Sequence, residues 1–308
     1  MPTSRFAAGA LTFVLATAFV LACQPLPVSA ETPSEFRAAL LAELGRDYEV
    51  SGTGHYLVAH PRGEGDRWAE RFEDLYRSFV DYFAVRGCQP AEPSSPLVGI
   101  VYRDRSDFAR HSTMQGGVPN GVVGYYDRNS NRINLYDMGN ADGANWRRNA
   151  AVLIHEATHQ MAFNTGIHSR ACPPPMWLAE GLAMLFEAPG VHDSRNYTQQ
   201  TDRVNWDRLR AFRQIMAPRH RPEILASIVA SDDLFRVNPA AAYAEAWALS
   251  FFLIETEPGQ YVEYLKRTAS CRPQAHTAAQ RTADFTAIFG ADWPMLEARF
   301  LRFMAATK

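Results

Sequence analysis

The stretch His155-Glu156-Ala157-Thr158-His159 decides how the rest of this chain is interpreted. Two histidines four residues apart lie on one face of a helix, so both imidazoles can bind a single metal ion. Glu156 points elsewhere but stays close enough to hold a water molecule and accept its proton. The apolar run at residues 150–154 suits a buried helix. The motif therefore predicts a metal site with a general base, on a helix beginning near Ala144.

A second apolar segment, residues 175–186, supplies the third ligand. Its carboxylate Glu180 lies among hydrophobic residues, and burying it is costly unless a cation neutralises it. Two histidines, one glutamate and an open fourth position form the ligand set of a catalytic zinc site. We therefore expect His155, His159 and Glu180 to bind one Zn²⁺ per chain. The alternative is a chance match, which the apolar flanks and Glu180 argue against.

At these residues the chain resembles the gluzincins, the metallopeptidase group that includes thermolysin and the zinc aminopeptidases. Residues 177–183, Trp-Leu-Ala-Glu-Gly-Leu-Ala, are similar to the helix that carries that group's third ligand. Within the group, the chain is similar to bacterial peptidase-MA-like proteins of uncharacterised function, which share a His-Glu-Ala-Thr-His-Gln core. The resemblance covers about residues 95–260. It implies a zincin-like fold, the three ligands named above, and Glu156 as general base.

One position departs from the gluzincin pattern. Many gluzincins carry Asp four residues after the third ligand, where it orients a ligand histidine, and here that residue is Met184. Another side chain must then orient the histidine. Glu187, seven residues after Glu180, is a candidate. The alternative is a solvated charge at the end of the helix.

A second catalytic residue is implied by the segment 241–253. Ala246, Leu249 and Leu253 recur at helical spacing, which predicts a helix with one packed face. The segment resembles the helix on which zinc aminopeptidases carry a tyrosine that donates to the oxyanion, and Tyr243 falls at the matching place. A phenol there would stabilise negative charge in the transition state. The alternative is a buried tyrosine whose hydroxyl bonds a backbone carbonyl.

Residues 1–30 are expected to lie outside the fold. Arg5 precedes an apolar stretch at residues 6–23, and small residues lead to a cleavage point after Ala30, as in a secretory signal peptide. A rival is the lipobox-like run ending at Cys23, which would leave a lipid anchor there. An uncleaved anchor is disfavoured because the stretch is short for a membrane span. Under each of these interpretations the rest of the protein is exported to the periplasm, the cell envelope or the medium. We expect no transmembrane domain in the mature chain.

Composition limits the partners. Removing the leader leaves roughly 280 residues, enough for one two-lobed domain or two small ones. The net charge is −2 with both signs mixed along the chain, which argues against nucleic acid and anionic membrane surfaces. The gluzincin resemblance implies a peptide or protein substrate. Export permits one disulfide among Cys88, Cys172 and Cys271, and Cys172 with Cys271 is our guess.

Hydrophobic patterns predict an α+β fold. A strand pair spans residues 48–60, an amphipathic helix 67–85, a strand 97–102, a short helix capped by Ser106 follows, and a hairpin pairs 121–126 with 132–136. From residue 144 the chain is almost entirely helical. We therefore expect an N-terminal α+β lobe at 31–143 and a helical lobe at 144–308, with the metal site where they meet.

The hairpin strand at residues 132–136 has a second candidate role. In gluzincins the strand bordering the cleft accepts an extended peptide as an added strand, and this one is similarly placed before the metal helix. Strand addition gives backbone hydrogen bonds that do not depend on the peptide's sequence. The alternative is an ordinary core strand.

These features predict an exported zinc metallopeptidase of the gluzincin type. Internal cleavage is favoured, because the glycine-rich motif of the zinc aminopeptidases is absent. The alternative from another class is a catalytically silent envelope protein that binds a peptide or cell-wall partner.

Overall fold

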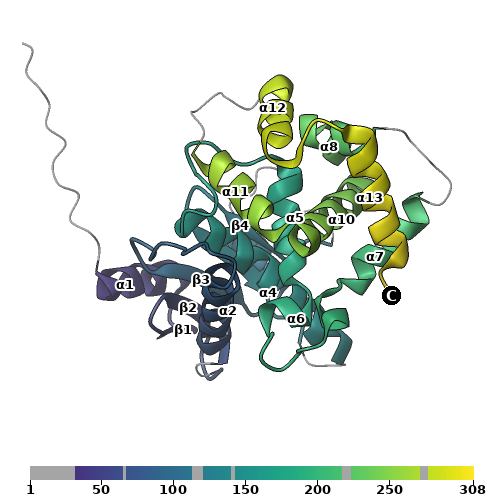
Figure 1. Ribbon diagram of the computed structural model, residues 1–308. Helices are drawn as coiled ribbons and strands as arrows, with labels where there is room; N and C mark the ends of the chain where they lie inside the picture. The colour runs from purple at the N-terminus through teal and green to yellow at the C-terminus, as the bar shows by residue number, and fades with distance from the viewer. Residues whose placement is uncertain (1–31, 65–66, 113–120, 140–142, 217–222, 271–276) are drawn as a thin grey trace, which may run out of the picture. The chain divides into compact units, whose positions relative to one another are not determined.

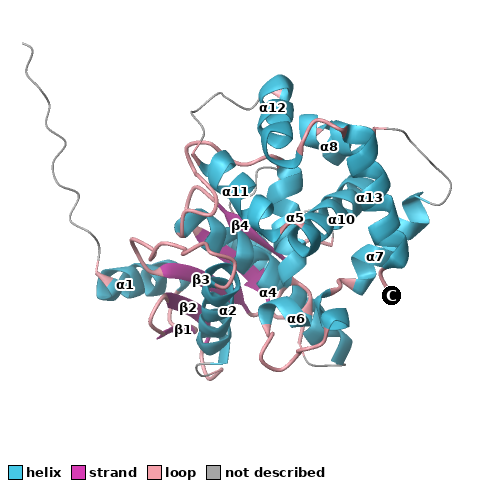
Figure 2. Cartoon of the chain, in the orientation of Figure 1, coloured by secondary structure: helices cyan, strands magenta, loops and turns pink. Residues whose placement is uncertain are grey.

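The computed structural model describes residues 32–64, 67–112, 121–139, 143–216, 223–270 and 277–308. Thr32–Lys308 form one compact unit. In the described ranges this unit contains a five-stranded mixed sheet and thirteen α-helices, most of which follow the sheet in the chain (Figures 1 and 2). The predicted α+β fold is confirmed. The division into two lobes after residue 143 remains a prediction.

The strand order places a short strand at the free edge of the sheet. The strands are β1 (Tyr48–Gly52), β2 (Tyr56–Pro61), β3 (Leu97–Tyr102), β4 (Gly124–Asp127) and β5 (Arg132–Tyr136), in the order β1-β2-β3-β5-β4. β1 and β2 form an antiparallel pair, β2, β3 and β5 run parallel, and β4 pairs antiparallel with β5. The hypothesis that residues 132–136 accept a substrate strand is therefore wrong, because both edges of β5 are already paired. Among the described strands, the outer one beside the metal helix is β4.

Apolar side chains cover both faces of the sheet. On one face, α1 (Pro33–Leu44) and α3 (Arg105–His111) contribute Leu40, Leu44 and Phe108 to a core. On the other face lie α2 (Arg67–Ala84) and α4 (Gly143–Asn164), whose apolar residues share a larger core with the helical part.

The N-cap of α3 differs from our prediction. The Asp104 carboxylate accepts hydrogen bonds from the backbone N–H groups of Ser106 and Asp107, so Asp104 is the cap and Ser106 is not. Both residue types favour this position, and the helix begins two residues earlier than predicted.

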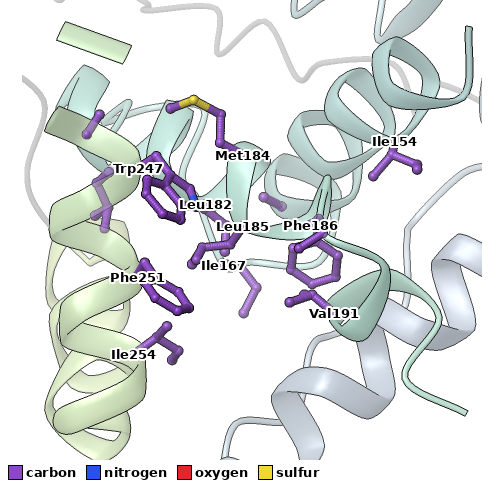
Figure 3. Packing of buried hydrophobic residues seen from close by; sticks show 14 of the residues in the cluster. Ile154, Ile167, Leu182, Met184, Leu185, Phe186, Val191, Trp247, Phe251 and Ile254 are labelled. Carbon is purple, nitrogen blue, oxygen red and sulfur yellow. The ribbon is translucent and has the colours of Figure 1, made fainter. Parts of the chain in front are cut away.

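The helical part is built around the contact of two helices. Its elements are α5 (Met176–Phe186), α6 (Pro189–His192), the 3₁₀ turn η1 (Gln200–Arg203), α7 (Trp206–Met216), α8 (Ile224–Ala230), α9 (Asp233–Val237), α10 (Pro239–Thr256), α11 (Pro258–Ala269), α12 (Ala278–Phe289) and α13 (Trp293–Ala306). α5 lies so close to α10 that a Cβ added at Gly181 would stand 2.6 Å from the Ala246 carbonyl oxygen. Figure 3 shows Trp247 and Phe251 of α10 facing Leu182 and Leu185 of α5.

Three expectations that bear on export concern a membrane span, the leader and the disulfide. Within the described ranges, no helix has the length and apolar character needed to span a bilayer. The predicted leader, residues 1–30, lies outside these ranges, as does Cys271. Cys172 is disulfide-bonded, and Cys88 is a buried free thiol.

Candidate metal centre

Two helices bring the three predicted ligands together. His155 and His159 project from one face of α4, and their Nε2 atoms lie 3.2 Å apart. Glu180 on α5 places its Oε2 atom 3.2 Å from Nε2 of His155 and 3.5 Å from Nε2 of His159. Each side chain is only 12–16% exposed. Sequence positions 25 residues apart thus converge on one point.

The spacing of these atoms fits a zinc ion. Zinc binds imidazole and carboxylate ligands at about 2.0–2.1 Å in a tetrahedral arrangement, whose ligand atoms stand about 3.3 Å apart. The observed separations of 3.2, 3.2 and 3.5 Å match the edges of such a tetrahedron. Three protein donors leave a fourth position for water or substrate, as catalytic zinc sites require.

Charge in the cluster favours a cation. Burial raises the pKa of the Glu180 carboxyl, but the charge of His159 and hydrogen bonds from both imidazoles hold it well below its ordinary value. For His155, burial lowers the pKa, while hydrogen bonds to Glu180 and Glu187 raise it well above the ordinary value. The cluster therefore keeps Glu180 ionised and attracts positive charge, which a divalent metal would supply.

Glu187 takes the orienting role that Met184 cannot. Nδ1 of His155 donates to Oε1 of Glu187 at 2.8 Å, and Nδ2 of Asn205 donates to Oε2 of Glu187 at 2.7 Å. Arg208 lies 3.6 Å from the same carboxylate. The bond fixes the His155 ring and leaves its Nε2 atom facing Glu180. Glu187 is only 15% exposed, so it is not a solvated helix-end charge.

Glu156 is half-buried and contacts the outer strand of the sheet. Its Oε2 atom accepts a hydrogen bond from the backbone N–H of Tyr126, on β4, at 2.8 Å. Burial raises the pKa of the Glu156 carboxyl above its ordinary value, although His155 and His159 oppose the shift. A carboxyl with a raised pKa can both accept and return a proton near neutral pH.

Tyr243 lies on α10, and the charges of the site affect the pKa of its phenol. Burial, and then the negative charges of Glu180 and Glu156, raise the pKa of Tyr243 to about 12. Its ring meets Phe235 edge to face and lies 5.8 Å from the Arg208 guanidinium. Within the described residues its hydroxyl forms no hydrogen bond, so the alternative of a bond to a backbone carbonyl is not what we observe. The phenol is protonated and free to donate.

His168 lies buried in the segment between α4 and α5. Its Nδ1 atom bonds the Ile167 carbonyl at 3.1 Å, and Nε2 has no partner in the described part of the chain. Burial, aided by the charge of His159, lowers the pKa of His168 to about 3. The ring is therefore neutral.

With the geometry established, comparison with known proteins shows two kinds of similarity. Residues 149–275 match a family described as "Protein of unknown function (DUF1570)". Glutamyl aminopeptidase from Bos taurus is 25% identical over 198 residues, that from Sus scrofa 29% over 160 residues, and that from Homo sapiens 23% over 197 residues. The matches cover 64%, 50% and 64% of this chain, but only 19%, 15% and 19% of the relatives. With the His-His-Glu group, these similarities indicate a peptidase-like protein.

Several residues around the centre were not foreseen from the sequence. Asn205 had a usable signal, because it precedes an amphipathic helix and accepts the Arg208 backbone N–H at 3.2 Å, as an N-cap does. Tyr126 had none, because its contact with Glu156 is made by the backbone and does not depend on residue type.

Proposed function

We propose that this protein is an exported zinc metallopeptidase of the gluzincin type. The observation that carries the proposal is the convergence of His155, His159 and Glu180 beside the half-buried carboxylate of Glu156. A zinc ion held by the three ligands would polarise the scissile carbonyl and acidify the attacking water.

The protein's own groups would then move the proton and hold the substrate. Glu156 accepts a proton from the attacking water and passes it to the leaving amine, because its raised pKa suits both steps. The Tyr126 N–H keeps the carboxylate beside β4. An extended peptide that pairs with the outer edge of β4, beside the N–H that Glu156 occupies, would lie next to this base and would be bound through its backbone.

Tyr243 would stabilise the charge that develops on the carbonyl oxygen. Its hydroxyl is protonated, because its pKa is about 12, and the charges of Glu180 and Glu156 contribute to this raised pKa. A preorganised donor contributes mainly in the transition state, where negative charge appears. Arg208 adds positive charge beside the same ring.

We also propose that the protein is exported and that it cleaves peptides internally. The leader pattern supports export, and so does the disulfide at Cys172, because disulfides persist in oxidising compartments. The partner is a peptide or protein. Internal cleavage is preferred on the absence of a glycine-rich anchor for a free amino terminus.

Turnover of a broad peptide library by purified protein tests the proposal. We expect cleavage that stops with a chelator and returns when zinc is restored, and mass spectrometry of the products separates internal from terminal cuts. Folded, zinc-loaded protein that cleaves nothing would support the alternative, a catalytically silent protein that binds a peptide or cell-wall partner.

A further inference from the structure

Arg170, in the segment between the two ligand helices, donates several hydrogen bonds to the β4–β5 hairpin that borders the site. We call this set of hydrogen bonds the grip. Arg170 donates from Nη1 to the Arg128 carbonyl oxygen at 2.6 Å, and from Nη2 to the Tyr126 hydroxyl at 2.8 Å and Oδ1 of Asn131 at 2.6 Å. Nη2 also lies 3.3 Å from Oδ1 of Asn164. All four acceptors are neutral oxygens. A planar guanidinium with five donors suits such a multipoint grip, whereas a surface ion pair would need only one carboxylate.

The gripped atoms tie the β4–β5 hairpin to the end of the metal helix. Asn131 sits in the turn with a φ of 58°, a left-handed conformation that asparagine tolerates. Its backbone carbonyl accepts from Nε2 of Gln160 at 2.7 Å, and its Oδ1 accepts from Nδ2 of Asn164 at 2.8 Å. Gln160 and Asn164 lie on the last turns of α4. Arg170 therefore completes a junction between the hairpin and the helix that carries Glu156.

Tyr126 connects this junction to the base. Its backbone N–H bonds Glu156 at 2.8 Å, while its phenol donates to Asn131 at 3.0 Å and accepts from Arg170. At the start of the same strand, a Cβ added at Gly124 would lie 2.9 Å from Val152 of α4. β4 is thus held beside α4 at two points. Gly124 packs closely on Val152, and Tyr126 is hydrogen-bonded to Glu156 and to Arg170.

We propose that Arg170 is a positioning residue, which acts through Tyr126 to align β4 with Glu156. The inference rests on the proposed function, because β4 would be the strand along which the substrate lies. A general base must be within hydrogen-bond reach of its proton. A shift of about 1 Å far from the reacting atoms can cost about 100-fold in rate. Releasing the grip would allow such a shift without touching a metal ligand.

Kinetics of Arg170→Ala test the inference in the full chain. We expect kcat to fall about 10- to 100-fold with about one zinc per chain retained. Tyr126→Phe, which keeps the backbone N–H and removes the phenol oxygen, should lose less. Arg170→Lys keeps the charge without the fork and should recover only part of the loss. The matched control is Arg128→Ala. The Arg128 side chain has the same charge on the same hairpin and lies 5.6 Å over the Phe163 ring, but it donates none of these hydrogen bonds, so kcat should stay close to the wild-type value.

A second readout does not depend on hydrolysis. The Tyr126 amide, bonded to Glu156, should exchange with solvent at least about 10-fold faster in Arg170→Ala than in Arg128→Ala. Wild-type kcat and unchanged exchange in zinc-loaded Arg170→Ala would overturn the inference, as would an equal loss in Arg128→Ala, which would assign the effect to charge. If the wild-type protein cleaved nothing, the proposed function would fail, and amide exchange would still decide whether Arg170 positions β4.

Discussion

The two sides of the metal centre are held in place by different forces. On the histidine side, α4 packs against the sheet and is also joined to it by hydrogen bonds: the fully buried Gln160 donates to the carbonyl oxygens of Val98 at 3.0 Å and Asn131 at 2.7 Å. On the glutamate side, α5 rests on α10 through close packing, with no side chain at Gly181 to separate the backbones.

This difference matches what each side must achieve. Hydrogen bonds are directional, so they fix the rotation of α4 and with it the directions of both imidazoles and of Glu156. Close packing fixes distance, because an interior without voids resists both added and removed volume. Glu180 must only stand at the right distance from the histidine pair. Loss of polar groups should therefore weaken chiefly the histidine side, and added volume at Gly181 should weaken the glutamate side.

We expect the largest effect from Tyr243→Phe, which tests whether α10 contributes to catalysis as well as to packing. Tyr243→Phe removes only the hydroxyl, and we expect kcat to fall about 100-fold with little change in KM. Zinc content should stay at the wild-type value. A tyrosine that only packs would give near-normal turnover and lose at most about 1 kcal/mol of stability. Normal kcat in the folded, zinc-loaded variant would remove Tyr243 from the mechanism.

Glu187 joins the two sides, because it ends α5 and orients His155 on α4. Glu187→Ala should weaken zinc binding by about 10- to 100-fold, as loss of an orienting partner does in other zinc sites. Competition with a chelator measures this affinity. Glu70→Ala, at an exposed position in the first turn of α2, is the control and should bind zinc as the wild type does. Equal affinities in the two variants would show that Glu187 does not support the site.

Gly181→Ala adds volume where α5 meets α10. The new Cβ would lie within 2.6 Å of the Ala246 carbonyl oxygen, so the helices must separate. We expect a loss of about 1–3 kcal/mol in the free energy of unfolding, and weaker zinc binding because Glu180 moves with α5. Gly259→Ala makes the same change in α11, where nothing lies within 4 Å, and should leave stability unchanged or slightly raised. Denaturant unfolding compares them, and equal stabilities would contradict the packing account.

A smaller effect should come from His168, between the two ligand helices. Its pKa is about 3 in the folded protein and about 6.5 when unfolded. Between these values only the unfolded chain binds the proton, so this contribution to stability is complete above pH 6.5 and is lost as the pH falls towards 3. From pH 6.5 to 5 the loss is roughly 1–2 kcal/mol. His168→Gln should therefore lose less stability than the wild type over this range, and equal pH dependence in denaturant unfolding would count against a buried neutral ring.

The histidine pair was predictable because it depends on local geometry alone. The spacing of His155 and His159 places both on one face of any helix, and Glu180 stands out as a carboxylate in an apolar segment. Tyr243 and Glu187 could be named as candidates. Their contacts could not be predicted, because α5, α7 and α10 meet only through tertiary packing.

The order of the strands in the sheet could not be predicted from the sequence. β4 and β5 form the predicted hairpin, but which of them is internal depends on the pairing of β5 with β3, across more than 30 residues. Nothing local distinguishes the two strands, so the substrate role was predicted for β5, both of whose edges are paired. The α3 cap failed for a different reason, since Asp104 and Ser106 both suit that position.

Metal analysis of two variants, with hydrolysis measured on the same samples, tests the central claim most directly. The wild type and Glu156→Gln should each hold about one zinc per chain, since Glu156 is a base and not a ligand, and only the wild type should cleave peptides. His159→Ala should lose both zinc and activity, because two remaining ligands cannot hold the ion. Full zinc in His159→Ala, or wild-type hydrolysis by Glu156→Gln, would contradict the account.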